Sequence, residues 1–85
     1  MAGTTQGDIP LSELRPGDLG RVCQVSESSA LERRLLDLGF LPETPVRMIR
    51  RAPLGDPIEF EIRGTRICLR REEAGHIRVR LGESP

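Results

Sequence analysis

Hydrophobic and charged residues alternate in the C-terminal third of the chain, and this pattern predicts short strands. Apolar side chains alternate with charged ones from Ile58 to Arg63 and again from Ile77 to Leu81. A period of two places the apolar side chains on one face of a sheet and leaves the other face to water. A further strand is expected at Arg66–Arg70, and Gly64-Thr65 before it predicts a type II′ hairpin with glycine first.

The N-terminal half carries the signals of one helix between two strands. Gly20–Val25 is predicted as the first strand and Val46–Ala52 as the second. Between them, Ser29 and Glu32 have the spacing of a capping box. Gly39 is a residue type that ends many helices in the left-handed conformation. The apolar stripe of this helix is formed by Leu31, Leu35 and Leu38.

Five short strands with one helix inserted after the first strand predict a mainly β fold, an SH3-like small five-stranded barrel. One helical turn is expected at Leu11–Leu14, ahead of the first strand. We expect a single domain over residues 9–82, because residues 1–8 have the small, polar composition of a disordered tail and 83–85 form a similar stub. The two terminal strands, Gly20–Val25 and Ile77–Leu81, are expected at sheet edges, where they could pair with a second copy.

Charge and cysteine content narrow the class of protein. The 85 residues carry 13 basic and 13 acidic side chains, so the zero net charge gives no support for direct nucleic-acid binding. Cys23 and Cys68 lie far apart and form no secreted disulfide pattern, which favours reduced thiols in the cytoplasm. The longest apolar run is far below membrane-spanning length, so direct membrane insertion is not expected.

Catalytic motifs are missing from the sequence. There is no phosphate-binding P-loop motif, and no motif arranges serine, histidine and aspartate as a nucleophile elbow or catalytic triad. The single histidine leaves no general base to spare. Glu59 and Glu61 share a strand face, where pairing with Arg66, Arg70 or Arg78 is expected instead of catalysis. The sequence therefore predicts a protein that is not an enzyme.

A metal site is one candidate for function. His76 follows Glu72 and Glu73 in an E-E-x-x-H pattern, and Cys68 lies on the strand before them. Imidazole, carboxylate and thiolate groups can hold Fe²⁺ or Zn²⁺, although a closed site needs about four ligands. A second chain or an anion would then have to complete the site, and a metal that bridges two chains would favour a dimer. The alternative is an exposed turn histidine and no required cofactor.

A partner-binding surface is the other candidate. Arg33, Arg34 and Asp37 should point outward from the helix, and Leu41 and Pro42 follow its end. An apolar residue beside a helix end can anchor a small interface. The alternative is a solvated helix face that has no partner. Phe40 is expected in the core, whereas the sequence leaves Leu41 open between core and surface.

The order of several motifs resembles the FeoA family over nearly the whole chain between its tails. They are the segments 11–17 (LSELRPG), 34–42 (RLLDLGFLP), 55–57 (GDP) and 67–70 (ICLR), followed by Glu73-Ala74 and 77–79 (IRV). The resemblance implies a cytosolic SH3-like accessory protein of bacterial ferrous iron uptake. It also implies a partner, the FeoB membrane transporter, which has a cytosolic GTPase domain. A different reading is an SH3-like module that works with a metal-dependent transcriptional repressor through another polypeptide.

One turn departs from the family pattern. The family commonly has Pro-Gly after the helix, whereas this chain has Pro42-Glu43. Glutamate is disfavoured at positive φ, so a type I turn is expected here in place of type II.

Overall fold

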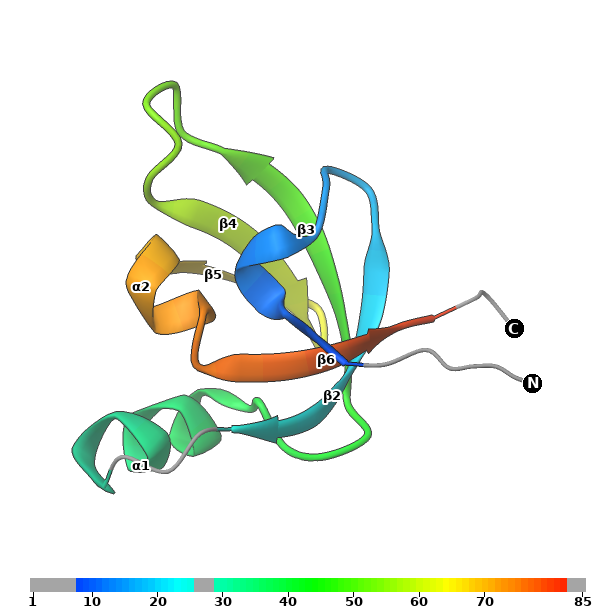
Figure 1. Ribbon diagram of the computed structural model, residues 1–85, viewed down its shortest axis with the longest axis vertical. Helices are drawn as coiled ribbons and strands as arrows, with labels where there is room; N and C mark the ends of the chain where they lie inside the picture. The colour runs from blue at the N-terminus through cyan, green and yellow to red at the C-terminus, as the bar shows by residue number, and fades with distance from the viewer. Residues whose placement is uncertain (1–7, 26–28, 83–85) are drawn as a thin grey trace.

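Six antiparallel strands, two helices and one 3₁₀ turn build the computed structural model (Figure 1), which describes residues 8–25 and 29–82. In chain order the elements are β1 (Ile9–Pro10), the 3₁₀ turn η1 (Leu11–Glu13), β2 (Leu19–Val25), α1 (Ser29–Leu38), β3 (Pro45–Arg51), β4 (Ile58–Ile62), β5 (Thr65–Leu69), α2 (Arg71–Ala74) and β6 (Ile77–Leu81). The mainly β, SH3-like architecture is confirmed. The sequence prediction missed β1 and α2.

The strands form one sheet in the order β1-β6-β2-β3-β4-β5. The terminal strand β6 therefore lies between β1 and β2 and pairs with both. The prediction that Gly20–Val25 and Ile77–Leu81 are edge strands is wrong, because these two strands pair with each other. Each of these strands has a neighbour on both sides, and the edges of the described sheet are β1 and β5, so the basis for the predicted edge-strand dimer is lost.

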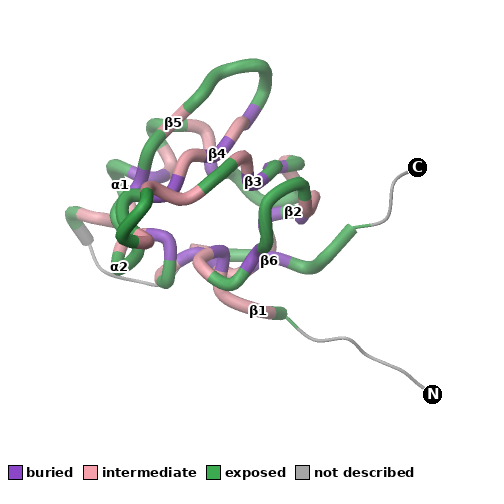
Figure 2. The backbone as a smooth tube through the Cα atoms, turned by 90° about the horizontal axis from the view of Figure 1, so that it is seen from above, coloured by how far each residue is buried: buried purple, intermediate pink, exposed green. Residues whose placement is uncertain are grey.

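Apolar side chains from the strands, the helices and the 3₁₀ turn form one core inside the curved sheet. Figure 2 shows the buried positions in this region. Phe40 is fully buried, as predicted, and so is Leu35. Leu38, the third residue of the predicted stripe, lies at the surface with 37% of its area exposed. The core consists of Leu11, Leu14, Val22, Leu35, Phe40, Val46, Met48, Ile58, Phe60, Ile62, Leu69, Ala74, Ile77 and Val79.

Arginine 51 ties β3 to the N-terminal turn. Its guanidinium donates hydrogen bonds to the carbonyl oxygens of Ser12 (2.7 Å) and Leu14 (3.0 Å). Asp8, the last residue of the predicted tail, is bound to β6, since its carbonyl oxygen accepts a hydrogen bond of 2.9 Å from the Arg78 guanidinium. The rest of the predicted tail, 1–7, and the stub at 83–85 lie outside the described residues. The side chain of Ser29, on which the predicted capping bond depends, is not described either.

The β4–β5 hairpin uses a different turn from the predicted one. Its two loop residues are Arg63 (φ 55°) and Gly64 (φ 80°), while Thr65 already pairs with Ile62. Positive φ at both central positions defines a type I′ turn, so the predicted type II′ turn at Gly64-Thr65 is wrong by one residue. The twist of type I′ matches the twist of the strands, which offsets the cost of a left-handed arginine.

The turn after α1 also corrects the sequence prediction. Glu43 has φ 71°, and the Thr44 N–H donates to the carbonyl oxygen of Leu41 at 3.1 Å. This is the geometry of a type II turn, so the expected type I turn is wrong. The Glu43 N–H also donates to the carbonyl oxygen of Val22 at 2.7 Å, and this bond to β2 holds the glutamate in place.

Replacement of Glu43 by glycine is expected to raise the free energy of unfolding by about 0.5–1 kcal/mol, because glycine has no Cβ to strain at positive φ. Urea denaturation of both proteins measures the change. Thr44→Gly is the matched control and should destabilise the protein, since Thr44 is not among the positive-φ residues. Equal effects of the two substitutions would contradict the argument.

Candidate docking surface

At the C-terminal end of α1, two neighbouring residues differ in burial: Phe40 is buried and Leu41 is exposed. Gly39, at φ 112°, donates to the carbonyl oxygen of Leu36 (3.0 Å), and the Phe40 N–H reaches back to the carbonyl oxygen of Leu35 (3.1 Å). These two bonds form a Schellman motif, which brings the residue after the glycine onto the last helical turn. Leu35 and Phe40 are both fully buried. Phe40 therefore closes the core beneath the helix end.

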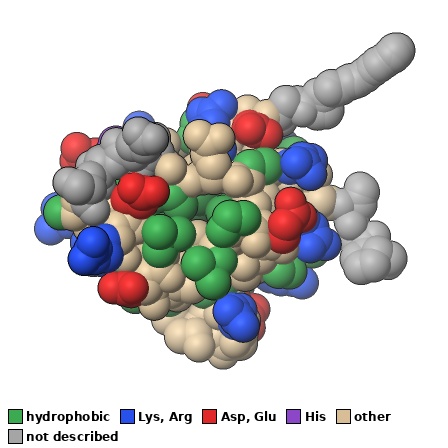
Figure 3. Space-filling model, turned by 90° about the horizontal axis from the view of Figure 1, so that it is seen from below, with side chains coloured by type: hydrophobic (Ala, Val, Ile, Leu, Met, Phe, Trp, Pro, Cys, Tyr) green, Lys and Arg blue, Asp and Glu red, His purple; other side chains and the backbone are tan. Residues whose placement is uncertain are grey.

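Leu41 lies on the outer side of this helix end. It is 41% exposed, and Leu38, in the last turn of α1, is 37% exposed. The turn that follows is fastened to β2, because Val22 donates to the Thr44 carbonyl oxygen at 3.0 Å. Seen from below, apolar side chains cluster on this side of the molecule between acidic and basic ones (Figure 3). The sequence left Leu41 open between core and surface, and the structure places it at the surface.

Charged side chains border this apolar area. Arg33 and Asp37 are exposed on α1, and together with Glu32 and Leu36 they line a shallow hollow of about 370 Å³. Pro42 is exposed beside Leu41. We refer to the exposed residues of this region as the α1 surface, which consists of Arg33, Asp37, Leu38, Leu41 and Pro42.

Arg34 has a different role from its neighbours. Its guanidinium forms an ion pair with Glu73 at 2.6 Å and thereby links α1 to α2. The side chain of Glu73 is only 19% exposed, and its second oxygen accepts a bond from the Arg70 N–H at 2.9 Å. Arg34 thus links the two helices, and its side chain, 56% exposed, also faces outward as predicted.

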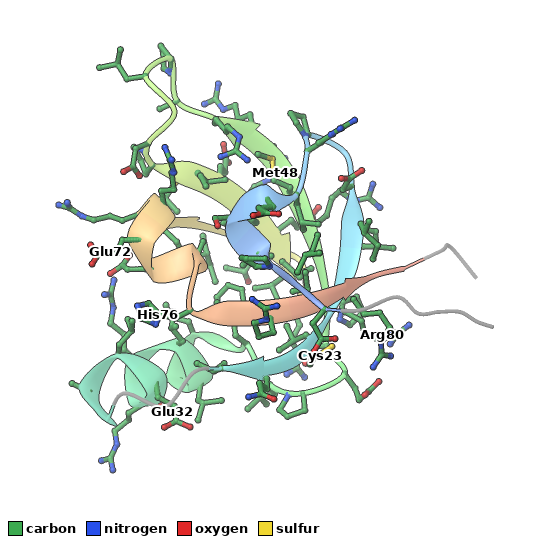
Figure 4. All side chains as sticks on the ribbon, in the orientation of Figure 1. Cys23, Glu32, Met48, Glu72, His76 and Arg80 are labelled. Carbon is green, nitrogen blue, oxygen red and sulfur yellow. The ribbon has the colours of Figure 1, made fainter. Side chains whose placement is uncertain are left out.

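The residues of the predicted metal site do not converge. In the described part of the chain, no three histidine, cysteine, aspartate or glutamate side chains lie close enough to hold a metal ion. Glu72 points away from α2 and His76 lies just before β6 (Figure 4), while the carboxylate of Glu73 forms an ion pair with Arg34. Cys68 is on β5, opposite Glu59 on β4. The predicted cluster is therefore not preassembled.

The pKa of Glu73 is held below its usual value by the hydrogen bond from the Arg70 backbone and, next, by Arg34. A depressed carboxyl pKa stabilises the fold above the unfolded-state value, about 4.3, and this contribution is lost as the pH falls through the folded-state pKa. Glu73→Gln should therefore be less stable than wild type at pH 7, and the difference should shrink below about pH 4. Urea denaturation at both pH values measures it, with exposed Glu72→Gln as the control.

A second carboxylate carries the ion pairs of the outer sheet face. Glu59 accepts bonds from Arg50 at 3.0 Å and Arg66 at 3.1 Å, and both lower its pKa. The expected pairing with Arg66 is confirmed.

The thiol of Cys23 donates to the Asp8 carboxylate at 3.4 Å, and partial burial is the first cause that raises the pKa of this thiol. Both cysteines are free thiols.

The described helices include none with the length and apolar character of a membrane span.

The model of the FeoA domain family matches residues 9–81. The chain is 35% identical over 71 residues to an Fe(2+) transport protein A/Fe(2+) transporter FeoB fusion protein of Porphyromonas gingivalis. That alignment covers 84% of this chain but only 8% of the fusion protein.

Solved structures agree with the match. The FeoA protein of Chlorobium tepidum is 42% identical with a TM-score of 0.80, over 86% of this chain and 70% of that one. The FeoA of Stenotrophomonas maltophilia, described as an SH3 domain protein complexed with zinc, is 36% identical with a TM-score of 0.74, over 81% of this chain and 86% of that one. The chain belongs to the FeoA family.

Proposed function

We propose that this protein is a cytoplasmic accessory protein of ferrous iron uptake that docks on the cytosolic part of a FeoB-type transporter. The observation that carries the proposal is the Porphyromonas gingivalis relative, in which a similar domain is fused to FeoB in one polypeptide. Two functions that share a chain in one organism are expected to work together when they are separate. The protein is proposed to act by binding and to carry out no reaction of its own.

The α1 surface is the contact that we propose for this docking. Leu38 and Leu41 offer an apolar centre, and Arg33 and Asp37 offer charges of both signs at its border. An apolar centre with a polar border is the usual composition of a protein interface. Phe40 beneath this centre is buried and keeps the helix end in one position, which lowers the cost of ordering the surface on binding.

A pull-down of the purified chain with the cytosolic region of the cognate transporter tests the proposal. The assay is run with Fe²⁺, with Zn²⁺ and with chelator. Because the predicted ligands are not preassembled, we expect retention of the transporter region to be equal in all three conditions. Retention only with metal would contradict this expectation and would point to Glu72, His76 and Cys68 as ligands that move together.

Failure to retain the transporter region under any condition would overturn the docking proposal. The module of a metal-dependent repressor would then be the function to test next, with the cognate repressor polypeptide as bait. Ferrous iron uptake in a strain that lacks the chain provides an independent readout. Uptake should fall on deletion and return with the wild-type gene, and unchanged uptake would contradict an accessory role.

A further inference from the structure

Strand β5 leaves one side of its backbone open. Among the described strands it is last in the sheet order and has β4 as its single neighbour. The β4–β5 pairing runs without a register shift from the Ile58–Leu69 pair to the Ile62–Thr65 pair, whereas the β2–β6 and β3–β4 pairings each shift. Bulges and prolines are two devices that protect sheet edges, and β5 has neither. This edge is therefore able to accept another strand.

The turn geometry identifies the backbone groups that face outward. In a hairpin with a two-residue loop, the pair next to the loop exchanges hydrogen bonds, and bonded pairs then alternate along the strands. Thr65, Ile67 and Leu69 therefore direct their N–H and C=O groups to β4, while Arg66 and Cys68 direct theirs away. Within the described residues these outward groups have no backbone partner. Both residues are exposed.

The charge along this edge favours one kind of occupant. Between positions 63 and 71 the chain has four arginines and no acidic residue. Glu59 on β4 pairs with Arg66 but shares its carboxylate with Arg50. A second copy of β5 would bring together two strands that each contain Arg66 and are flanked by Arg63 and Arg70, which like-charge repulsion opposes. An acidic strand would instead meet complementary charge.

The outer face beside β5 offers space for a side chain. A hollow of about 190 Å³ lies next to Cys68 and Glu59, and its wall includes Pro53 and Pro57. In strand addition, main-chain hydrogen bonds supply affinity and such pockets select side chains. We propose that the β5 edge binds an extended, acidic segment of a partner protein as an added antiparallel strand. This proposal shares no residue with the α1 surface and does not depend on the proposed docking.

The test uses the full chain, labelled with ¹⁵N, and two synthetic peptides. The probe is an acetylated, amidated peptide of alternating valine and glutamate, and its counterpart has lysine in place of glutamate. With the acidic peptide, the amide signals of Arg66 and Cys68 should shift, and their hydrogen exchange should slow at least about tenfold. The lysine peptide should bind at least about fivefold more weakly, and salt should reduce that difference.

Two double variants separate the edge from overall charge. Arg66→Gln with Arg70→Gln should weaken binding of the acidic peptide at least about threefold. Arg47→Gln with Arg80→Gln removes the same charge from exposed positions elsewhere and should leave binding unchanged. The spectrum of each variant reports whether it is folded.

Several outcomes would overturn the proposal. They are shifts confined to α1, equal binding of the two peptides, equal loss in both double variants, and no shift at millimolar peptide. Cys68→Pro, which removes one outward N–H, supplies a further check in a folded variant, because it should abolish the slowed exchange at Arg66. Concentration-dependent shifts at Arg66 and Cys68 without peptide would overturn the proposal in favour of a second copy.

Discussion

Replacement of Phe40 by alanine is expected to lower the free energy of unfolding by about 3–5 kcal/mol, the usual cost of removing a fully buried phenylalanine. The side chain is 0% exposed and belongs to the main core cluster. Its ring also supplies the apolar contact of the Schellman motif, since Leu35 and Phe40 are the two residues that this motif brings together. The loss thus combines a core cavity with a weakened helix end.

Urea denaturation measures this effect, and the neighbouring position provides the control. Domains of this length have a total stability of about 4–13 kcal/mol, so Phe40→Ala should unfold at much lower urea concentration than wild type. Leu41→Ala, one residue further along, removes a side chain that is 41% exposed and should cost less than about 1 kcal/mol. Equal losses in the free energy of unfolding would contradict the assignment of Phe40 to the core and Leu41 to the surface.

Local patterns predicted most of the fold. Strands β4 and β6 were found because a period of two is visible within five residues, and α1 was found from its helical stripe and Gly39. The arrangement of β1, β2 and β6 was not found, because it depends on pairs such as Ile9 with Val79, which are distant in sequence. The assignment of edge strands therefore failed, since edges are a property of the assembled sheet.

Turn types failed for a related reason. Propensity favours glycine at positive φ, yet Arg63 and Glu43 adopt it because the strand register and a bond to β2 require it. Tertiary context thus overrode the local preference at both positions. Helix α2 was missed. Residues 71–74 are good helix formers, but four residues are too short a pattern to distinguish a helix from a turn.

The candidate site was predicted in part. Proximity along the chain correctly grouped the exposed residues at the end of α1, because a helix fixes their spacing. It also grouped Glu72, Glu73 and His76, but sequence spacing does not show that Glu73 has a nearer partner in Arg34, 39 residues away. The strand edge that we propose as a second binding surface has no sequence signature, since it depends on the place of β5 at the end of the described sheet.

Replacement of Leu41 by aspartate is expected to weaken binding to the transporter's cytosolic region at least about tenfold, which corresponds to about 1.4 kcal/mol. The substitution removes an apolar group from the centre of the α1 surface and places a charge where water would be excluded on docking. Because Leu41 is 41% exposed, the fold should tolerate it. Calorimetric titration of the purified cytosolic region measures the affinity.

Leu54→Asp is the matched control, because it makes the same chemical change at a leucine that is 94% exposed. Leu54 lies in the loop between β3 and β4, at the opposite end of the molecule from α1 (Figure 1). If exposed apolar area alone governed binding, Leu54→Asp would have the larger effect. If the α1 surface is the contact, only Leu41→Asp weakens binding and fails to restore iron uptake in the deletion strain. Equal affinities of the two variants would contradict docking through α1.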